Sequence, residues 1–178
     1  KNISHFFGKL DLDLNLQNFI SSDLSMSLEN VSDDTYLKIF DANIVNNNLK
    51  PNNFNILNSE IKLSLDHEKY NFVTGFQSFE NLQLKDSDRY QYIFPYYNFN
   101  KILSQNYMHG FLNLKSSGTN ELKNTNNLRS KIINDLSYNG FDIISALGIK
   151  NNLKLNLKNL NSIGKNDSEY KSSPQIEL

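Results

Sequence analysis

The feature that most constrains this chain is an alternation of apolar and polar residues with a period of two. From Gly8 to Gln17, leucine occupies every even position from 10 to 16, and the odd positions are all polar or charged. Successive side chains of a β-strand point to opposite faces, whereas a helix would spread these leucines around its surface. The segment is therefore predicted to be a strand with one apolar face and one polar face.

The same alternation recurs along the chain. It is found at residues 24–29, 61–66, 70–76, 112–115, 128–138 and 153–158. Together with the segments between them, these residues predict an all-β chain of about ten antiparallel strands, each about ten residues long, that follow one another up and down as a meander. No segment has the spacing of an amphipathic helix.

Turn and loop signals separate the predicted strands. A short turn at 67–69 links two of them. Asn139-Gly140 predicts a two-residue hairpin into a strand over about 141–149, because a type I′ turn needs positive φ at both positions. Longer connections are predicted in three asparagine-rich stretches, at 46–55, 85–88 and 117–127. Pro95 has no amide hydrogen and is predicted to interrupt the ladder of its strand.

Composition excludes several classes of protein. The mean hydropathy is -0.54, and no stretch approaches the roughly 20 apolar residues that a membrane-spanning helix needs. The net charge is -1, and the basic residues are dispersed along the chain, which argues against a nucleic-acid partner because that requires a concentrated basic face. The chain has no cysteine, so disulfides and thiolate chemistry are excluded as well.

Strand length and charge favour an outer-membrane β-barrel over a soluble β-sandwich, which stays as an alternative. Transmembrane strands run to about ten residues, whereas soluble strands average about five or six. The polar residues Lys9, Asp11, Asp13 and Asn15 are predicted to face a water-filled lumen, with the leucines of the same strand facing lipid. An aromatic cluster from Tyr90 to Phe99 is consistent with a girdle at the membrane interface. In isolation such strands are expected to form an open, curved sheet with unpaired edges.

Two segments carry a family resemblance. Residues 30–38, NVSDDTYLK, resemble the "VSD…Y" segment of the lipopolysaccharide-assembly protein LptD, also called the organic solvent tolerance protein. Residues 88–99, DRYQYIFPYYNF, resemble its "DRY.Y..P…F" segment in the α-proteobacterial form, and a weaker block spans 124–126 and 133–136. The motif positions are Ser32, Asp33, Asp34, Tyr36, Asp88, Arg89, Tyr90 and Pro95.

The resemblance implies that residues 1–178 are an internal part of the LptD-like barrel domain in the outer membrane of a Gram-negative bacterium. Such a barrel assembles lipopolysaccharide into the outer leaflet and releases it laterally through its wall. The implied partners are lipopolysaccharide, outer-membrane lipid, an LptE-like plug lipoprotein and an LptA-like periplasmic bridge, the last through a jelly roll that this sequence lacks. Rival interpretations are another outer-membrane porin or receptor barrel, and a soluble β-sandwich binding module.

The sequence offers no pattern typical of an enzyme or of a cofactor site. The three histidines, His5, His67 and His109, are far apart, and none has the close partner that a metal site needs. No nucleophile motif or Gly-rich phosphate loop is present. The motif residues are therefore expected to order loops or the lumen rather than to perform covalent chemistry, since Ser and Asp commonly bond to nearby backbone in turns and an Asp–Arg pair can fix a loop.

Overall fold

The computed structural model describes residues 4–44, 49–51, 53–124, 126–164 and 167–177. Its elements lie in this order: β1 (His5–Asp13), β2 (Ser21–Val31), α1 (Tyr36–Ile39), η1 (Asp41–Asn43), β3 (Ile56–His67), β4 (Tyr70–Asn81), η2 (Asp86–Arg89), β5 (Tyr90–Ser104), β6 (Gly110–Lys123), β7 (Asn127–Gly140), β8 (Ile143–Ile144), β9 (Lys150–Asn151), β10 (Lys154–Gly164) and β11 (Asp167–Glu177). The predicted all-β class is confirmed.

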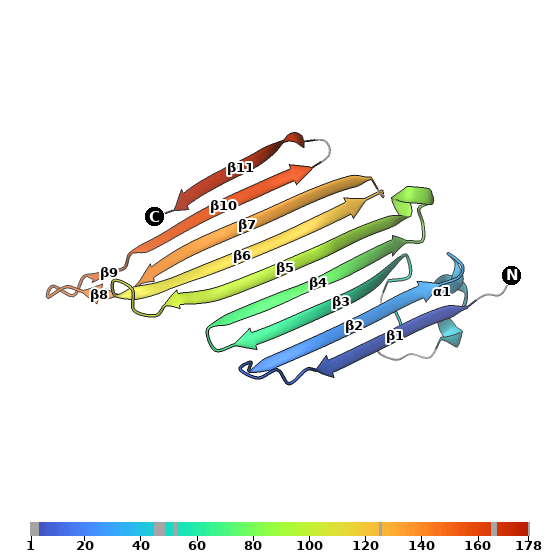
Figure 1. The fold of residues 1–178 in the computed structure, drawn as a ribbon, viewed down its shortest axis with the longest axis horizontal. Helices are drawn as coiled ribbons and strands as arrows, with labels where there is room; N and C mark the ends of the chain where they lie inside the picture. The colour runs from blue at the N-terminus through green and yellow to red at the C-terminus, as the bar shows by residue number, and fades with distance from the viewer. Residues whose placement is uncertain (1–3, 45–48, 52, 125, 165–166, 178) are drawn as a thin grey trace.

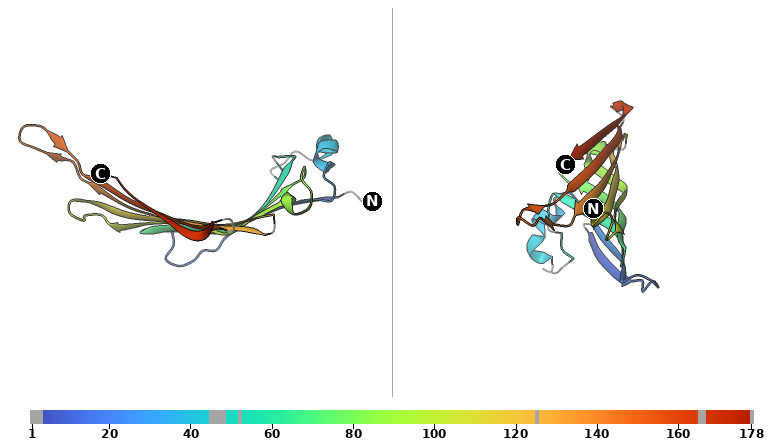
Figure 2. Two further views of the ribbon diagram at one scale, coloured as in Figure 1. Left: turned by 90° about the horizontal axis from the view of Figure 1, so that it is seen from above. Right: turned by 90° about the vertical axis from the view of Figure 1, so that its left-hand side faces the viewer.

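Nine of these strands form one antiparallel sheet, and each strand pairs with the next strand of the meander. The order across the sheet is β1-β2-β3-β4-β5-β6-β7-β10-β11, while β8 and β9 pair only with each other as a small extension. The sheet is twisted and curved, with β1 and β11 at its two edges (Figures 1 and 2). The predicted up-and-down meander is therefore confirmed, in the form of an open sheet.

The strand register places the apolar positions of the separate strands on one face of the sheet. Leu12 pairs with Leu24, which pairs in turn with Leu63, across β1, β2 and β3. Towards the other edge, Leu114, Leu136 and Leu157 are aligned in the same way across β6, β7 and β10. Because side chains alternate strictly along each strand, this register gathers the leucines on one side, the apolar face, and the charged residues on the other, the polar face.

The apolar face is largely exposed, and the buried core lies elsewhere. Large side chains of this face that are exposed in the isolated sheet include Phe6, Leu10, Leu12, Leu28, Ile61, Phe76, Leu128, Ile132, Leu157 and Ile163. Among the described residues, the buried hydrophobic side chains form one small cluster at α1, made of Val31, Leu37, Ile44, Leu57 and Leu82. Exposed apolar surface of this extent is typical of a region that contacts another protein or a membrane.

The polar face is the concave one. In Figure 2, α1 lies over the concave side of the curved sheet, at the end nearest the N-terminus. Val31 belongs to the cluster beneath α1 and Phe7 packs against it. Both residues share a strand parity with the polar residues Lys9 and Asp11 of β1 and Ser27 of β2. The hollows of the sheet surface also open among polar-face residues, such as Lys62, Lys115 and Asp135. The charged side chains of the sheet therefore line its inner, concave surface.

The hairpin predicted at Asn139-Gly140 is wrong, and so is the strand predicted over 141–149. Asn139 pairs with Phe111 on one side and with Lys154 on the other, so β7 continues through both residues. The chain instead makes a longer excursion through β8 and β9, which turns at Gly148 with φ 78°. Cross-strand hydrogen bonds on both sides of β7 outweigh the local preference of Asn-Gly for a tight turn.

Other boundaries also differ from the prediction. The stretch 117–127 is mostly strand, because β6 runs to Lys123 and its Ser and Thr side chains continue the alternation of the sheet. The stretch 85–88 is a connection, as predicted, but residues 86–88 belong to η2. Of 46–55, residues 46–48 and 52 lie outside the described residues, and the others precede β3. The four-residue helix α1 was not predicted.

β5 explains the aromatic cluster and the role of Pro95. Most aromatic residues of this fifteen-residue strand lie on the apolar face, namely Tyr90, Tyr92, Tyr97 and Phe99, whereas Tyr96 lies on the polar face. The girdle stays a prediction, because a girdle consists of aromatic residues at one level on many strands of a barrel. The interruption predicted at Pro95 is confirmed: the pairing register shifts between Ile93 and Tyr96.

Gly118 lies where the ring of Tyr97 crosses from β5 to β6 on the apolar face. A Cβ added at Gly118 would overlap Cε1 of Tyr97. We expect Gly118→Ala to lower the free energy of unfolding by about 1–3 kcal/mol, since the ring must leave its packed position. Urea unfolding in detergent, followed by far-UV circular dichroism, measures this loss. Gly164→Ala is the control, because its nearest neighbour would be 3.7 Å away; an equal loss at both glycines would contradict the explanation.

Candidate functional site

The structure joins the two motif segments through Arg89. Its Nη2 lies 2.7 Å from Oδ1 of Asp34, and its Nε donates a 2.7 Å hydrogen bond to Oε1 of Glu80. The side chains of Arg89 and Glu80 are each 17% exposed, and that of Asp34 is 51% exposed. The hydrogen bond to Asp34 is the main cause that raises the pKa of Arg89 above its ordinary value. The guanidinium thus stays charged and holds a loop from each segment at the same end of the sheet.

The first segment folds by side-chain bonds to nearby backbone. Oδ1 of Asp33 accepts hydrogen bonds from the backbone N and Oγ1 of Thr35, at 3.0 and 2.7 Å, and starts the turn into α1. Oγ of Ser32 accepts a 2.7 Å hydrogen bond from the backbone N of Ser4. These bonds support the prediction that Ser32 and Asp33 order the loop.

Tyr36 connects α1 to the first strand. Its hydroxyl lies 2.5 Å from Nδ1 of His5, and the two rings are 5.1 Å apart. The His5 ring stacks in turn on Phe7, at a centroid distance of 4.8 Å. The α1 segment is therefore anchored to β1 by a polar contact and by ring packing, next to the small buried cluster that contains Leu37.

The remaining motif residues are placed differently. Asp88 is exposed, and no interaction of its side chain is found among the described residues. The aspartate that pairs with Arg89 is Asp34. The hydroxyl of Tyr90 donates a 3.3 Å hydrogen bond to Glu80. Pro95 lies within β5, apart from this group. Glu80 was not predicted, although it was detectable, because it is an acidic residue at a position of β4 that has apolar-face parity.

Three of the four residues predicted to face a lumen share one face of the sheet. Lys9, Asp11 and Asp13 are on the concave polar face of β1, and Lys9 pairs with Asp11 at 3.0 Å. Asn15 is not part of that row, because β1 ends at Asp13 and Asn15 has φ 48° in the following turn. Oδ1 of Asp13 accepts a 2.9 Å hydrogen bond from the backbone N of Asn15. The chain therefore leaves the strand before the last four residues of the predicted alternation, 14–17.

Charge is confined almost entirely to the polar face. In β1–β7 and β10, sixteen of eighteen acidic or basic side chains have this parity, and the exceptions are Glu80 and Lys101 near strand ends. The polar face is also divided from one edge to the other. On β1–β3 it carries six acidic and two basic residues; on β6, β7 and β10 the proportion is reversed. We call the six basic residues of the second group the basic strip: Lys115, Lys123, Arg129, Lys131, Lys154 and Lys158.

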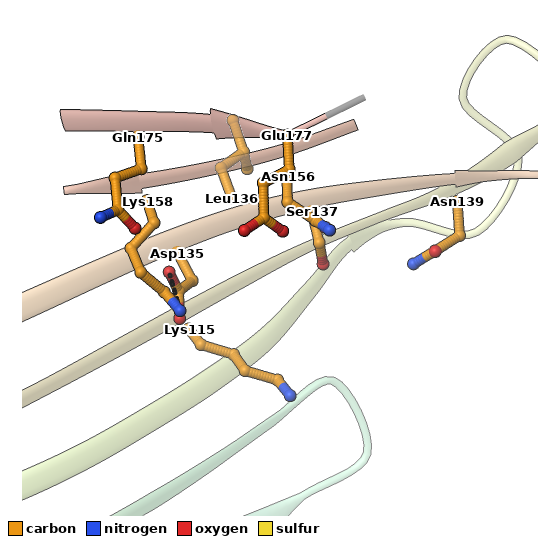
Figure 3. Close-up of a pocket in the computed structure, with 9 residues that line it drawn as sticks. All are labelled: Lys115, Asp135, Leu136, Ser137, Asn139, Asn156, Lys158, Gln175 and Glu177. Carbon is orange, nitrogen blue, oxygen red and sulfur yellow. Dashed lines mark ion pairs between the residues drawn. The ribbon is translucent and has the colours of Figure 1, made fainter. Parts of the chain in front are cut away.

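Shallow hollows open on the polar face beside the basic strip. One, of about 300 Å³, is lined by Lys115, Asp135 and Lys158 together with residues of β11 (Figure 3). A second, of about 240 Å³, shares Asp135 and Lys158 and adds Lys131. Nζ of Lys158 lies 3.8 Å from Oδ1 of Asp135, and that oxygen is buried without a hydrogen bond. This part of the surface can accept a polar ligand between strands.

A metal site and similarity to known proteins would be two further indications of function. Within the described ranges, no group of three histidine, cysteine or acidic side chains is arranged to hold a metal ion. No helix in the described part of the chain has the length and apolar character needed to cross a membrane. Comparisons with protein-family models, with curated proteins and with solved structures found no match.

Proposed function

We propose that this sheet is part of the wall of an outer-membrane β-barrel, with its apolar face against lipid and its concave polar face lining the lumen. The observation that carries the proposal is the confinement of charge to one face, opposite an apolar face with exposed large side chains on β1–β4, β7 and β10. In hydrocarbon every backbone polar group must be paired internally. The ladders from β1 to β11 meet this need, and closure of the barrel would pair the two edges.

We further propose that the barrel passes lipopolysaccharide to the outer leaflet and performs no covalent chemistry. Two facts support this proposal: the resemblance of residues 30–38 and 88–99 to LptD segments, and the ion pair that joins these segments through Asp34 and Arg89. In this role the polar face contacts the sugar portion of the lipid or an LptE-like plug. An LptA-like bridge and a jelly roll belong to the same proposal.

Cysteine labelling tests the membrane arrangement, since the chain has no cysteine of its own. Single cysteines at Leu63 and Leu114 represent the apolar face, and those at Ser64 and Lys115 represent the polar face of the same strands. The four variants are reconstituted in lipid vesicles and treated with a water-soluble maleimide. We expect labelling at 64 and 115 to be at least about tenfold faster than at 63 and 114, because hydrocarbon excludes the reagent and suppresses the thiolate.

Equal labelling on both faces would contradict the membrane proposal and favour a soluble sheet covered by another layer of protein. The lipopolysaccharide part of the proposal needs its own measurement. A photo-crosslinking residue at Ser117, on the polar face, should capture lipopolysaccharide in cells, and the same residue at Ile132, on the apolar face, should capture phospholipid. Capture of small solutes alone would favour a porin or receptor barrel.

A further inference from the structure

We propose that the basic strip binds the phosphate groups of a sugar headgroup as it passes along the concave face. This inference rests on the proposed function and names the part of the surface that takes the anionic portion of the lipid. A row of cations on a concave wall raises the local concentration of anions, and low-dielectric surroundings strengthen the effect.

Most cations of the strip are not neutralised by the protein. Lys115, Arg129, Lys131 and Lys154 have no ion pair or hydrogen bond of their side chains within the part of the chain that the structure describes. The other two cations have an acidic neighbour: Lys123 pairs with Glu121 at 3.0 Å, and Lys158 with Asp135 at 3.8 Å. Basic side chains clustered on one face without partners are available to an external anion.

The spacing of the strip suits a ligand with more than one anionic group. Lys115 and Lys158 face Asp135 from its two neighbouring strands, so their backbones are about 10 Å apart. Lys131 lies four residues from Asp135 on the same strand and lines the second hollow. A single phosphate contacts one of these positions, whereas a sugar that carries several phosphates spans two or more.

The acidic half of the polar face would orient the bound ligand. β1–β3 carry Asp11, Asp23, Glu60 and Asp66 among their acidic residues. An anionic headgroup is repelled there and attracted by β6, β7 and β10, so the sheet orients the ligand toward one side of the lumen. Asp135 is an acidic residue inside the basic half, and its buried Oδ1 opposes an incoming anion.

Binding of a defined probe tests the inference. The probe is the phosphorylated core oligosaccharide released from lipopolysaccharide, labelled with a fluorophore, and the protein is the full chain in neutral phosphatidylcholine vesicles. We expect K115Q/K158Q to weaken binding about tenfold or more and to reduce its dependence on salt. K9Q/K62Q removes the same charge from the acidic half and should change the affinity less than about twofold. D135N should strengthen binding, because it removes the opposing carboxylate.

Equal losses of affinity in the two double variants would overturn the inference, and so would equal binding of the dephosphorylated oligosaccharide. Displacement of the probe by an equal concentration of inorganic phosphate would also overturn it, because the strip would then be a site for free phosphate. Circular dichroism of each variant verifies that the sheet is formed. The cysteine-labelling experiment is independent of this one. If labelling shows that the apolar face lies in lipid but the chain does not bind the probe, the present inference is overturned and the barrel proposal stands.

Discussion

Arginine in place of Ile61 should oppose membrane insertion of the sheet by about 2–4 kcal/mol, the cost of a cation at the lipid-facing midpoint of a barrel strand. Ile61 lies near the middle of β3 on the apolar face and is 44% exposed in the isolated sheet. In water the same substitution would be nearly neutral, because surface changes usually alter stability by less than about 0.5 kcal/mol. The Ile61→Arg variant therefore separates a lipid-facing surface from a solvated one.

Ser64→Arg is the matched control on the same strand. Ser64 has the opposite parity and faces Asp23 across the β2–β3 ladder, so an arginine there lies in the acidic half of the polar face. We expect Ser64→Arg to insert like the unmodified chain. The measurement is the urea dependence of folding into lipid vesicles, followed by circular dichroism. Equal insertion of the two arginine variants would overturn the assignment of the apolar face to lipid.

Removal of Arg89 should have the largest effect at the end of the sheet. Arg89→Ala leaves Glu80 as a carboxylate that is 17% exposed and no longer paired with a cation, and it frees the α1 loop from η2. Breaking such a nearly buried pair costs about 3 kcal/mol, most of which comes from the charge left behind. We expect the free energy of unfolding to fall by about that amount in urea titrations, and limited proteolysis to cut near residues 32–40 first.

Asp88→Asn provides the control, because it changes a charged side chain next to Arg89 that has no partner among the described residues; it should change the free energy of unfolding by less than about 0.5 kcal/mol. Adding Glu80→Gln to Arg89→Ala should recover part of the loss, since the unpaired carboxylate is then neutral. If the double variant is no more stable than Arg89→Ala, the buried charge is not the cause of the destabilisation.

Side-chain alternation made the strands and their faces predictable. The leucines at 10, 12, 112, 114, 155 and 157 needed no knowledge of neighbouring strands, because period two is a property of each strand alone. Local signals were less reliable at the boundaries. Asn139-Gly140 has the composition of a tight turn, yet it lies within β7 because strands on both sides offer hydrogen bonds.

The candidate site was predictable only in part. The motif segments 32–36 and 88–90 were recognised from the sequence, but their contact was not, since Asp34 and Arg89 are 55 positions apart and nothing local relates them. Glu80 completes the group from a third element. The division of the polar face into acidic and basic halves was also invisible, because the near-zero net charge of the chain conceals it.

The sequence by itself therefore determined the all-β class and, within the main strands, which side chains share a face, because alternation follows from backbone geometry within one strand. Only the tertiary structure decided how the faces align from strand to strand, where Arg89 finds its partners and which half of the concave surface is basic. Those properties depend on the pairing register, and the register is fixed by hydrogen bonds between strands and by the requirement that all apolar faces lie on the same side.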